Sequence, residues 1–246
     1  MASDTKPTVL FVHGNWHSPA HFAPICDLFN KAGYPTSCPR LASCDASPSV
    51  GPYEDAASLL PELVKLVEAQ ERDVIVVAHS YGGVVATQAI TEQFAENVRG
   101  MKGKRGGILR IVYLCALLPV EGETVMSQFG VGPSDPIPPH ILLDGNDMAT
   151  LSNPAERFYA DLSPQEQQRW IEQLIPNAVK VMVTPISHLE YSHYPITYIF
   201  CEDDQAIPFG LQKRMVEKVK NLGIEVQEHT LKSSHSPFLI CLDLNL

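Results

Sequence analysis

Residues 73–90, DVIVVAHSYGGVVATQAI, decide the fold expected for this 246-residue chain. An apolar run rich in valine leads into AHSYG at 78–82, and apolar residues at helical spacing follow. A serine on a sharp turn between a strand and a helix needs small residues two positions before and after it, because the strained backbone brings these neighbours close together. Ala78 and Gly82 meet this demand. The stretch therefore predicts a nucleophile elbow of the G-x-S-x-G type, with alanine at the first glycine position and Ser80 as nucleophile.

Similar apolar runs recur on both sides of this turn and alternate with helical patterns. The runs lie at residues 8–13, about 35–41, 73–79, 108–117, 196–201 and 224–231, and the helical patterns at about 19–32, 54–70, 82–98 and 209–222. Strands that alternate with helices predict a mostly parallel sheet flanked by helices. We therefore expect an α/β domain with a central sheet of about six strands.

A long insertion interrupts this alternation, because about 75 residues separate Pro119 from Ile196, too many for a simple crossover. After a proline-rich segment, NPAE at 153–156 and SPQE at 163–166 each combine an N-cap residue, a proline at the first helical position and a glutamate that completes a capping box. The sequence thus predicts an inserted helical cap. Its expected bounds are 119–191, with residues 1–118 and 192–246 forming the core.

Composition and charge exclude several classes of protein. With 45% hydrophobic and 19% charged residues, the chain can bury one sizeable core. The formal net charge of -10 comes without a Lys/Arg-rich run, so neither nucleic acid nor an anionic membrane is an expected partner. The six scattered cysteines form no C-x-x-C pair and are expected to be reduced thiols, not metal ligands. Without a signal-peptide pattern or a membrane-spanning run, we expect a cytoplasmic protein.

An elbow serine needs a base, and this base needs an orienting acid. In enzymes with this elbow the chain order is serine, acid, histidine, which points past the insertion. There the fifth predicted strand runs into EDD at 202–204, and the last runs into LKSSHSPF at 231–238. We expect His235 to be the general base and Asp204 the acid, although position alone does not separate Asp204 from Asp203.

The first predicted strand ends in HGNWH at 13–17, a glycine-containing turn whose backbone N–H groups can point into a crevice. We expect the oxyanion hole to consist of the N–H groups of Asn15 and of Tyr81, the residue after the nucleophile. His13 and His17 are expected to be structural or to line the pocket, because neither fits the chain order of a catalytic base. The expected pocket residues are Gly14, Trp16, His17, Phe129, Phe158 and Trp170, with core packing as the alternative for most of the aromatic side chains.

With HGNWH, AHSYGG, DQAIP and SSHSPF in this order, the chain resembles the α/β-hydrolase superfamily, and within it the compact group of plant methyl esterases and hydroxynitrile lyases. The resemblance covers nearly the whole chain, including the cap. The chain is also similar to small fungal-type hydrolases with the same HGNWHSP opening and NPAERFYADLSP segment. This resemblance implies an α/β-hydrolase fold and a triad of Ser80, Asp204 and His235.

The resemblance also separates esterase from lyase. In members that cleave cyanohydrins, a threonine replaces the glycine after the first histidine and a lysine follows the catalytic histidine, whereas this chain has Gly14 and Ser236. It therefore favours hydrolysis of an ester or related acyl bond of a small, apolar molecule, without metal or organic cofactor. Two alternatives stay open: a lyase or cyclase of secondary metabolism that uses the same pocket, and a small-molecule binding protein or receptor with vestigial hydrolysis.

The end of the chain departs from the family pattern. Members usually carry a full helix after the catalytic histidine, but this sequence ends eleven residues beyond His235. We expect one short helix starting at Pro237, and an apolar tail that covers the sheet or pairs with a second subunit in a homodimer.

Overall fold

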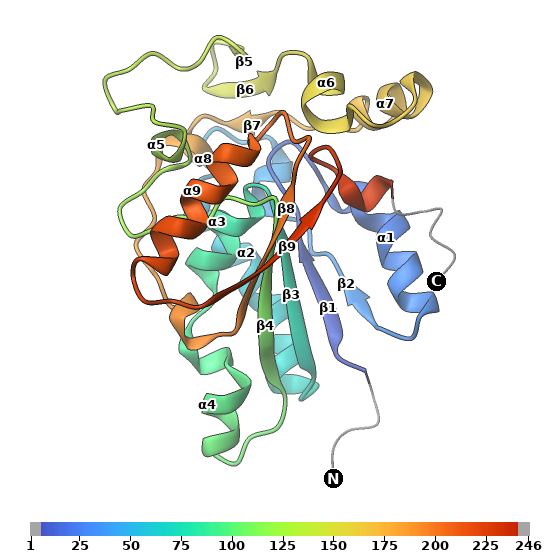
Figure 1. Ribbon diagram of the computed structural model, residues 1–246, viewed down its shortest axis with the longest axis vertical. Coiled ribbons are helices and arrows are strands. Elements are labelled where there is room, and N and C mark those ends of the chain that lie inside the picture. The colour runs from blue at the N-terminus through green and yellow to red at the C-terminus, as the bar shows by residue number, and fades with distance from the viewer. Residues whose placement is uncertain (1–5, 241–246) are drawn as a thin grey trace.

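The computed structural model describes residues 6–240, which form a central parallel sheet flanked by helices (Figure 1). The strand order is β2-β1-β3-β4-β8-β9, and all neighbouring strands pair in parallel. The strands are β1 Thr8–Val12, β2 Thr36–Ser37, β3 Asp73–His79, β4 Gly107–Leu114, β8 Ile196–Cys201 and β9 Val226–Leu231. The predicted sheet of about six mostly parallel strands is confirmed.

Within residues 6–240, five α-helices accompany this sheet outside the insertion, connected in places by short helical turns. The helices are α1 Pro19–Lys31, α2 Pro52–Leu63, α3 Gly82–Ala89, α4 Glu96–Met101 and α9 Phe209–Lys220. The turns are η1 Ala42–Asp45, η2 Val64–Ala69, η3 Glu92–Phe94, η4 Tyr191–His193 and η5 Pro237–Leu239. The short helix expected to start at Pro237 is therefore present, and the remaining tail, 241–246, lies outside the described residues.

The inner strands of the sheet are buried on both faces, as alternate residues of β1 show, whereas the edge strand β9 is largely exposed. Val9 and Phe11 belong to one apolar cluster, which also contains Phe22 of α1. Leu10 and Val12 belong to a second, larger cluster that includes residues of α2 and α3. Successive side chains of a strand point to opposite faces, so a strand covered on both sides is apolar at every position. This explains why the first apolar run lacks alternation with polar residues.

Two predicted elements are shorter than expected. β2 has two residues because Pro39 lacks an N–H group and cannot continue the ladder. The helix expected over 82–98 ends at Ala89, where the β-branched residues Ile90 and Thr91 take extended backbone angles. The chain resumes as η3 and α4, and the carbonyl of Thr91 accepts a hydrogen bond from the hydroxyl of Tyr194 at 2.5 Å.

Most of the segment 119–191, called the cap from here on, lies over the carboxyl ends of the core strands, and the last residues of this segment return along the side of the core toward the start of β8 (Figure 1). The cap contains α5 Val125–Gln128, β5 Ile141–Leu143, β6 Met148–Leu151, α6 Pro154–Tyr159, α7 Pro164–Ile171, β7 Asn177–Ala178 and α8 Lys180–Val183. The insertion contains helices as predicted, and in addition β5, β6 and β7 form a small antiparallel sheet that was not predicted.

The two predicted capping boxes in the cap have different outcomes. Ser163 forms half of the predicted box: its hydroxyl accepts a hydrogen bond from the N–H of Glu166 at 3.3 Å, but within the described residues the Glu166 carboxylate makes no bond back to the N–H of Ser163. Asn153, in contrast, takes a left-handed conformation with φ 52°, and its side chain makes no capping bond to α6. The left-handed backbone turns the Asn153 side chain away from the first N–H groups of the helix, so the prediction of a capping box there was wrong.

Two predictions from composition can also be compared with the structure. None of the helices in the described part of the chain has the length and apolarity needed to span a membrane. Five of the six cysteines are described, and all five are free thiols, namely Cys26, Cys38, Cys44, Cys115 and Cys201. The sixth, Cys241, lies outside the described residues.

Candidate active site

Ser80 occupies the turn between β3 and α3 in a strained conformation. Its φ is 54°, in the left-handed region that residues with a side chain rarely adopt. The carbonyl of Ser80 accepts hydrogen bonds from the N–H groups of Gly83 at 3.1 Å and Leu117 at 3.0 Å, which hold the turn. Ala78 and His79 before it are buried, whereas Ser80 is half-buried and lines a cavity. The strained turn thus presents the serine to the cavity.

Close backbone packing explains the small residues around the turn. A Cβ on Gly82 would lie 2.2 Å from the carbonyl oxygen of Val12, and one on Gly83 would lie 2.1 Å from that of Leu117. A Cβ on Gly14 would lie 2.7 Å from the Cβ of Ser80. Glycine at 82 therefore allows α3 to start against the end of β1, and glycine at 14 leaves room for the nucleophile itself.

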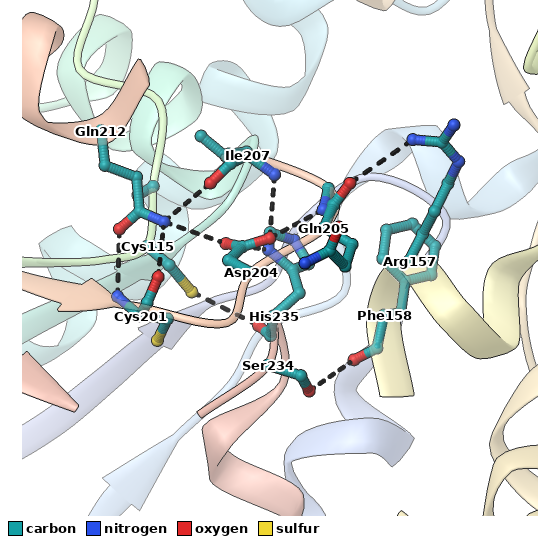
Figure 2. A network of polar contacts seen from close by, with 12 residues as sticks. Cys115, Arg157, Phe158, Cys201, Asp204, Gln205, Ile207, Gln212, Ser234 and His235 are labelled. Carbon is teal, nitrogen blue, oxygen red and sulfur yellow. Dashed lines mark hydrogen bonds and ion pairs between the residues drawn. The ribbon is translucent and has the colours of Figure 1, made fainter. Parts of the chain in front are cut away.

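Asp204 and His235 form a buried pair beside the turn (Figure 2). The Nδ1 of His235 lies 2.8 Å from Oδ2 of Asp204, and both side chains are completely buried. Oδ1 of Asp204 accepts hydrogen bonds from the backbone N–H groups of Ala206 at 2.8 Å and Ile207 at 2.9 Å. Asp203 is exposed. The carboxylate that contacts the histidine is therefore that of Asp204, and backbone N–H groups hold its other oxygen.

Sequence analysis missed Gln212, a fully buried residue of α9 that supports the acid. Its Nε2 donates to Oδ2 of Asp204 at 3.3 Å and to the carbonyl of Ile207 at 2.7 Å, and its Oε1 accepts from the N–H of Cys201 at 3.0 Å (Figure 2). The amide thus joins the end of β8 to the loop that carries Asp204. The only signal in the sequence was a polar residue on the apolar face of an amphipathic helix.

The loop of His235 is fixed from three sides. The Nε2–H of His79 donates to the carbonyl of His235 at 2.8 Å. Asp161 of the cap accepts a hydrogen bond from the N–H of Ser234 at 2.7 Å. The ring of Phe158 stacks against the imidazole of His235, with centroids 5.4 Å apart. These contacts determine the position of the imidazole, and His79 joins Gln212 among the supporting residues that the sequence analysis did not identify.

One imidazole atom remains free for chemistry. Nε2 of His235 is buried and has no hydrogen-bond partner within residues 6–240. Because Nδ1 is held by Asp204, Nε2 is the atom that would accept a proton. Catalytic hydrogen bonds are often long without substrate and shorten when it binds.

His13 and His17 have structural contacts. His13 Nδ1 lies 3.1 Å from the carbonyl of Gly14, and its Nε2 accepts from the N–H of Leu41 at 3.3 Å. His17 Nδ1 lies 2.8 Å from the carbonyl of Asn15. Burial lowers the pKa of His13 to about 4 and the pKa of His17 well below its usual value. Both rings are therefore neutral at pH 7, and each supports the loop after β1.

The two residues expected to form the oxyanion hole line the same cavity as Ser80. Among the described residues, neither the N–H of Asn15 nor that of Tyr81 donates to another backbone carbonyl. The hydroxyl of Tyr81 lies elsewhere, because it donates to Asp55 at 2.8 Å and is buried. The backbone of Tyr81, not its side chain, is thus the part that can stabilise an oxyanion.

The cavity at Ser80 has a volume of about 230 Å³ and a mainly apolar lining from core and cap. Of the predicted pocket residues, Trp16, Phe129 and Phe158 line it. Residues that the sequence analysis did not single out also line it, among them Val125, His140, Ile141, Arg157 and Met182. They come from cap loops, a three-residue strand and very short helices, where no sequence periodicity marks the buried face.

The structure places the other three predicted pocket residues outside this lining. Gly14 lies behind Ser80, where a Cβ would contact the serine. His17 is buried, and its Nε2 lies 3.1 Å from the hydroxyl of Tyr159. Trp170 is buried against His21 of α1, with ring centroids 5.6 Å apart, so it joins cap to core as in the packing alternative.

These features, a strained elbow serine at the carboxyl end of a parallel sheet and a cap over it, define an α/β-hydrolase fold. Residues 9–239 match the model of the alpha/beta hydrolase family. The match spans almost all of the chain, and the protein belongs to the alpha/beta hydrolase family. The fold and family predicted from the motifs are therefore confirmed.

Two curated fungal proteins are similar over most of their length. The alpha/beta hydrolase nvfD of Aspergillus novofumigatus is 27% identical over 221 residues, which cover 87% of this chain and 84% of that protein. The probable hydrolase R7 of a Phoma species is 28% identical over 237 residues, or 95% of this chain and 92% of the relative. The prediction of a hydrolase is thus confirmed at the level of the family.

Solved structures show the same fold at lower identity. An extracellular alpha/beta-hydrolase from a Paenibacillus species has a TM-score of 0.72 and 20% identity, with 97% of both chains covered. Polyneuridine aldehyde esterase has a TM-score of 0.70 and 17% identity, with 97% of this chain and 98% of that chain covered.

Proposed function

We propose that the protein is a serine esterase that hydrolyses an ester, or a related acyl bond, of a small and mainly apolar molecule. The observation that carries the proposal is the position of Ser80 on a strained turn in the wall of an apolar cavity. The buried Asp204–His235 pair adds an imidazole whose Nε2 has no partner within residues 6–240. Membership in the alpha/beta hydrolase family supports it.

In the proposed cycle, Nε2 of His235 accepts the hydroxyl proton of Ser80 while the serine oxygen attacks the ester carbonyl. The N–H groups of Asn15 and Tyr81 stabilise the negative charge on the tetrahedral intermediate. His235 then protonates the leaving alcohol, which leaves an acyl-enzyme on Ser80. Water activated by His235 releases the acid and restores the serine. Asp204 holds the imidazole in the productive tautomer and stabilises its protonated form.

A fluorophosphonate probe and short p-nitrophenyl esters test this proposal. We expect wild type to be labelled and to release nitrophenol, and Ser80→Ala to lose both signals while its circular dichroism and melting temperature stay the same. Ser192→Ala removes an exposed serine of η4 and is the matched control. A labelled Ser80→Ala variant would contradict the role of Ser80. Stoichiometric labelling of wild type without turnover of any ester would favour a binding protein.

Product analysis separates hydrolysis from a lyase or cyclase reaction in the same pocket. Hydrolysis in water enriched in ¹⁸O places the label in the acid product, because the acyl-enzyme is cleaved by solvent. A product of unchanged oxygen content that still required Ser80 would overturn the hydrolytic proposal.

A further inference from the structure

One charged side chain interrupts the apolar lining of the cavity. Arg157 lies on α6, next to Phe158, and is half-buried among the lining residues. Figure 2 shows its guanidinium extended beyond the Asp204–His235 pair, toward the loop that carries Gln205. Arginine has five N–H donors and stays charged at every physiological pH. A half-buried guanidinium keeps part of its hydration, and an anion that binds it in the cavity gains from the apolar surroundings.

The described residues offer few hydrogen bonds and no ion pair to the guanidinium of Arg157. The one hydrogen bond of the guanidinium within residues 6–240 runs from Nη1 to the carbonyl of Gln205, and it is long, at 3.4 Å. Nε is buried and has no partner among these residues. Arg157 also has no ion pair there, since the nearby carboxylate of Asp161 bonds to Ser233 and Ser234 instead.

A second polar side chain in the cavity lining is that of His140. His140 lines the cavity, and its pKa is lowered first by burial and then by the charge of Arg157. The imidazole is therefore neutral near pH 7 and can donate a hydrogen bond in the cavity that Arg157 also lines. The chain as a whole carries a formal charge of -10, so an anion entering the cavity would need a specific local partner.

We propose that the substrate carries a carboxylate which binds to Arg157, with His140 as a second donor. The planar guanidinium matches a carboxylate with two parallel hydrogen bonds, and its terminal nitrogens are the donors for that geometry, because within residues 6–240 Nη2 makes no hydrogen bond and Nη1 makes only the long one to Gln205. The substrate class is thus an ester with an apolar body and a free carboxylate away from the scissile bond. This inference rests on the proposed esterase function and names the substrate class of that site.

Binding to Ser80→Ala tests the inference without turnover. The probes are monomethyl esters of the dicarboxylic acids from succinate to pimelate, each compared by calorimetry with its neutral mono-amide counterpart. At the best chain length we expect the carboxylate to bind at least about tenfold more tightly than the amide, the effect typical of a hydrogen-bonded charge. Arg157→Met in the same background should abolish this preference, and Arg157→Lys should retain part of it.

Arg169→Met is the matched control, because Arg169 is an exposed cap arginine on α7 that pairs with Glu166 and does not line the cavity. It should leave the preference intact. A role of Arg157 in stability alone would instead lower the melting temperature and weaken acid and amide equally. Equal binding of acid and amide, or a preference that survives Arg157→Met, would overturn the inference.

Labelling of Ser80 distinguishes a failure of the carboxylate-binding inference from a failure of the proposed esterase function. If Arg157→Met still reacts with the fluorophosphonate and still cleaves neutral p-nitrophenyl esters, the esterase proposal stands whatever the binding data show. If wild type never reacts with the probe but the carboxylate preference depends on Arg157, the esterase proposal fails and the anion site remains.

Discussion

At the scale of single residues, the environment of Asp204 makes a strong prediction about catalysis. Asp204→Asn keeps the volume and one acceptor oxygen, but it can place an NH₂ group opposite Nδ1 of His235. The imidazole would then take the wrong tautomer, and we expect kcat for a p-nitrophenyl ester to fall by about 10³- to 10⁴-fold with the fold retained. Asp203→Asn changes an exposed carboxylate and should leave kcat within about twofold of wild type. Equal losses in the two variants would contradict the assignment.

Asp55 predicts a pH dependence of stability. Its buried carboxylate accepts hydrogen bonds from the N–H of Ser43 at 2.7 Å and from the hydroxyl of Tyr81, and burial raises its pKa to about 6. Between the usual pKa of 3.8 and pH 6 the folded protein therefore binds more protons than the unfolded chain, so this residue's contribution to the free energy of unfolding decreases as pH rises.

The matched variant for this prediction is Asp55→Asn, which cannot ionise. Chemical denaturation at pH 4.5, 5.5 and 6.5 should show the stability of wild type falling relative to the variant by roughly 2 to 3 kcal/mol over the full titration. Parallel curves for the two proteins would mean that the Asp55 carboxyl titrates normally.

Residue roles could be predicted from sequence where chain order fixes them. Ser80 and His235 each follow a predicted strand, so their place at one edge of the sheet follows from the topology of parallel strands. Gln212 and His79 could not be predicted as supporting residues. Their contacts join elements far apart in sequence, and a buried amide or imidazole leaves no periodic signal. Sequence position likewise could not separate Asp204 from Asp203, because the choice depends on the direction that the backbone takes after β8.

At the scale of elements, the cap is joined through Trp16 to the loop that follows β1. The N–H of Trp16 donates to Oδ1 of Asn177 on β7, and its indole N–H donates to the carbonyl of Ala149 on β6 at 2.9 Å. Its carbonyl accepts from the N–H of Ile175 at 2.8 Å. Trp16 has a φ of 62°, so these bonds hold a strained backbone next to Asn15.

Asn177→Ala should therefore affect both stability and turnover. It removes the acceptor for Trp16 and the bond from Nδ2 to the carbonyl of Ser43 at 3.1 Å, and leaves buried groups unpaired. We expect a loss of about 1 to 3 kcal/mol in the free energy of unfolding and a lower kcat, because the Asn15 N–H is no longer fixed. Asn177→Asp keeps the acceptor and should retain more of kcat than the alanine variant. A kcat unchanged in Asn177→Ala would show that the cap does not position this loop.

Elements of the core were easier to predict than those of the cap for a physical reason. Inner core strands such as β1 are apolar on both faces, and the pattern of α9 repeats over three turns, so each gives a sustained signal. The cap strands β5, β6 and β7 have two to four residues each, too short for any pattern to emerge. Their pairing depends on contacts with the core.

At the scale of the whole molecule, buried histidines set the response to acid. Four of them, His13, His17, His21 and His79, are nearly or fully inaccessible to solvent, and burial is the main cause of a lowered pKa in each. Below pH 6.5 the unfolded chain binds protons at these positions and the folded protein does not, so stability rises with pH across this window and is lost as pH falls. The raised pKa of Asp55 makes stability fall as pH rises, but the four histidines outweigh this single carboxyl group.

The net effect predicts that acid unfolds the protein with an uptake of protons. From the slope of the free energy of unfolding against pH, measured with urea between pH 5 and pH 7, we expect the unfolded state to bind about two to three more protons than the folded state near pH 5.5. His13→Gln should reduce this number by nearly one, because the pKa of His13 near 4 keeps it neutral throughout the range in the folded state. His188→Gln removes an exposed histidine and should leave the slope unchanged. A flat or inverted slope in wild type would mean that these four imidazoles are protonated in the folded protein, which is incompatible with the hydrogen bond that His13 accepts from Leu41.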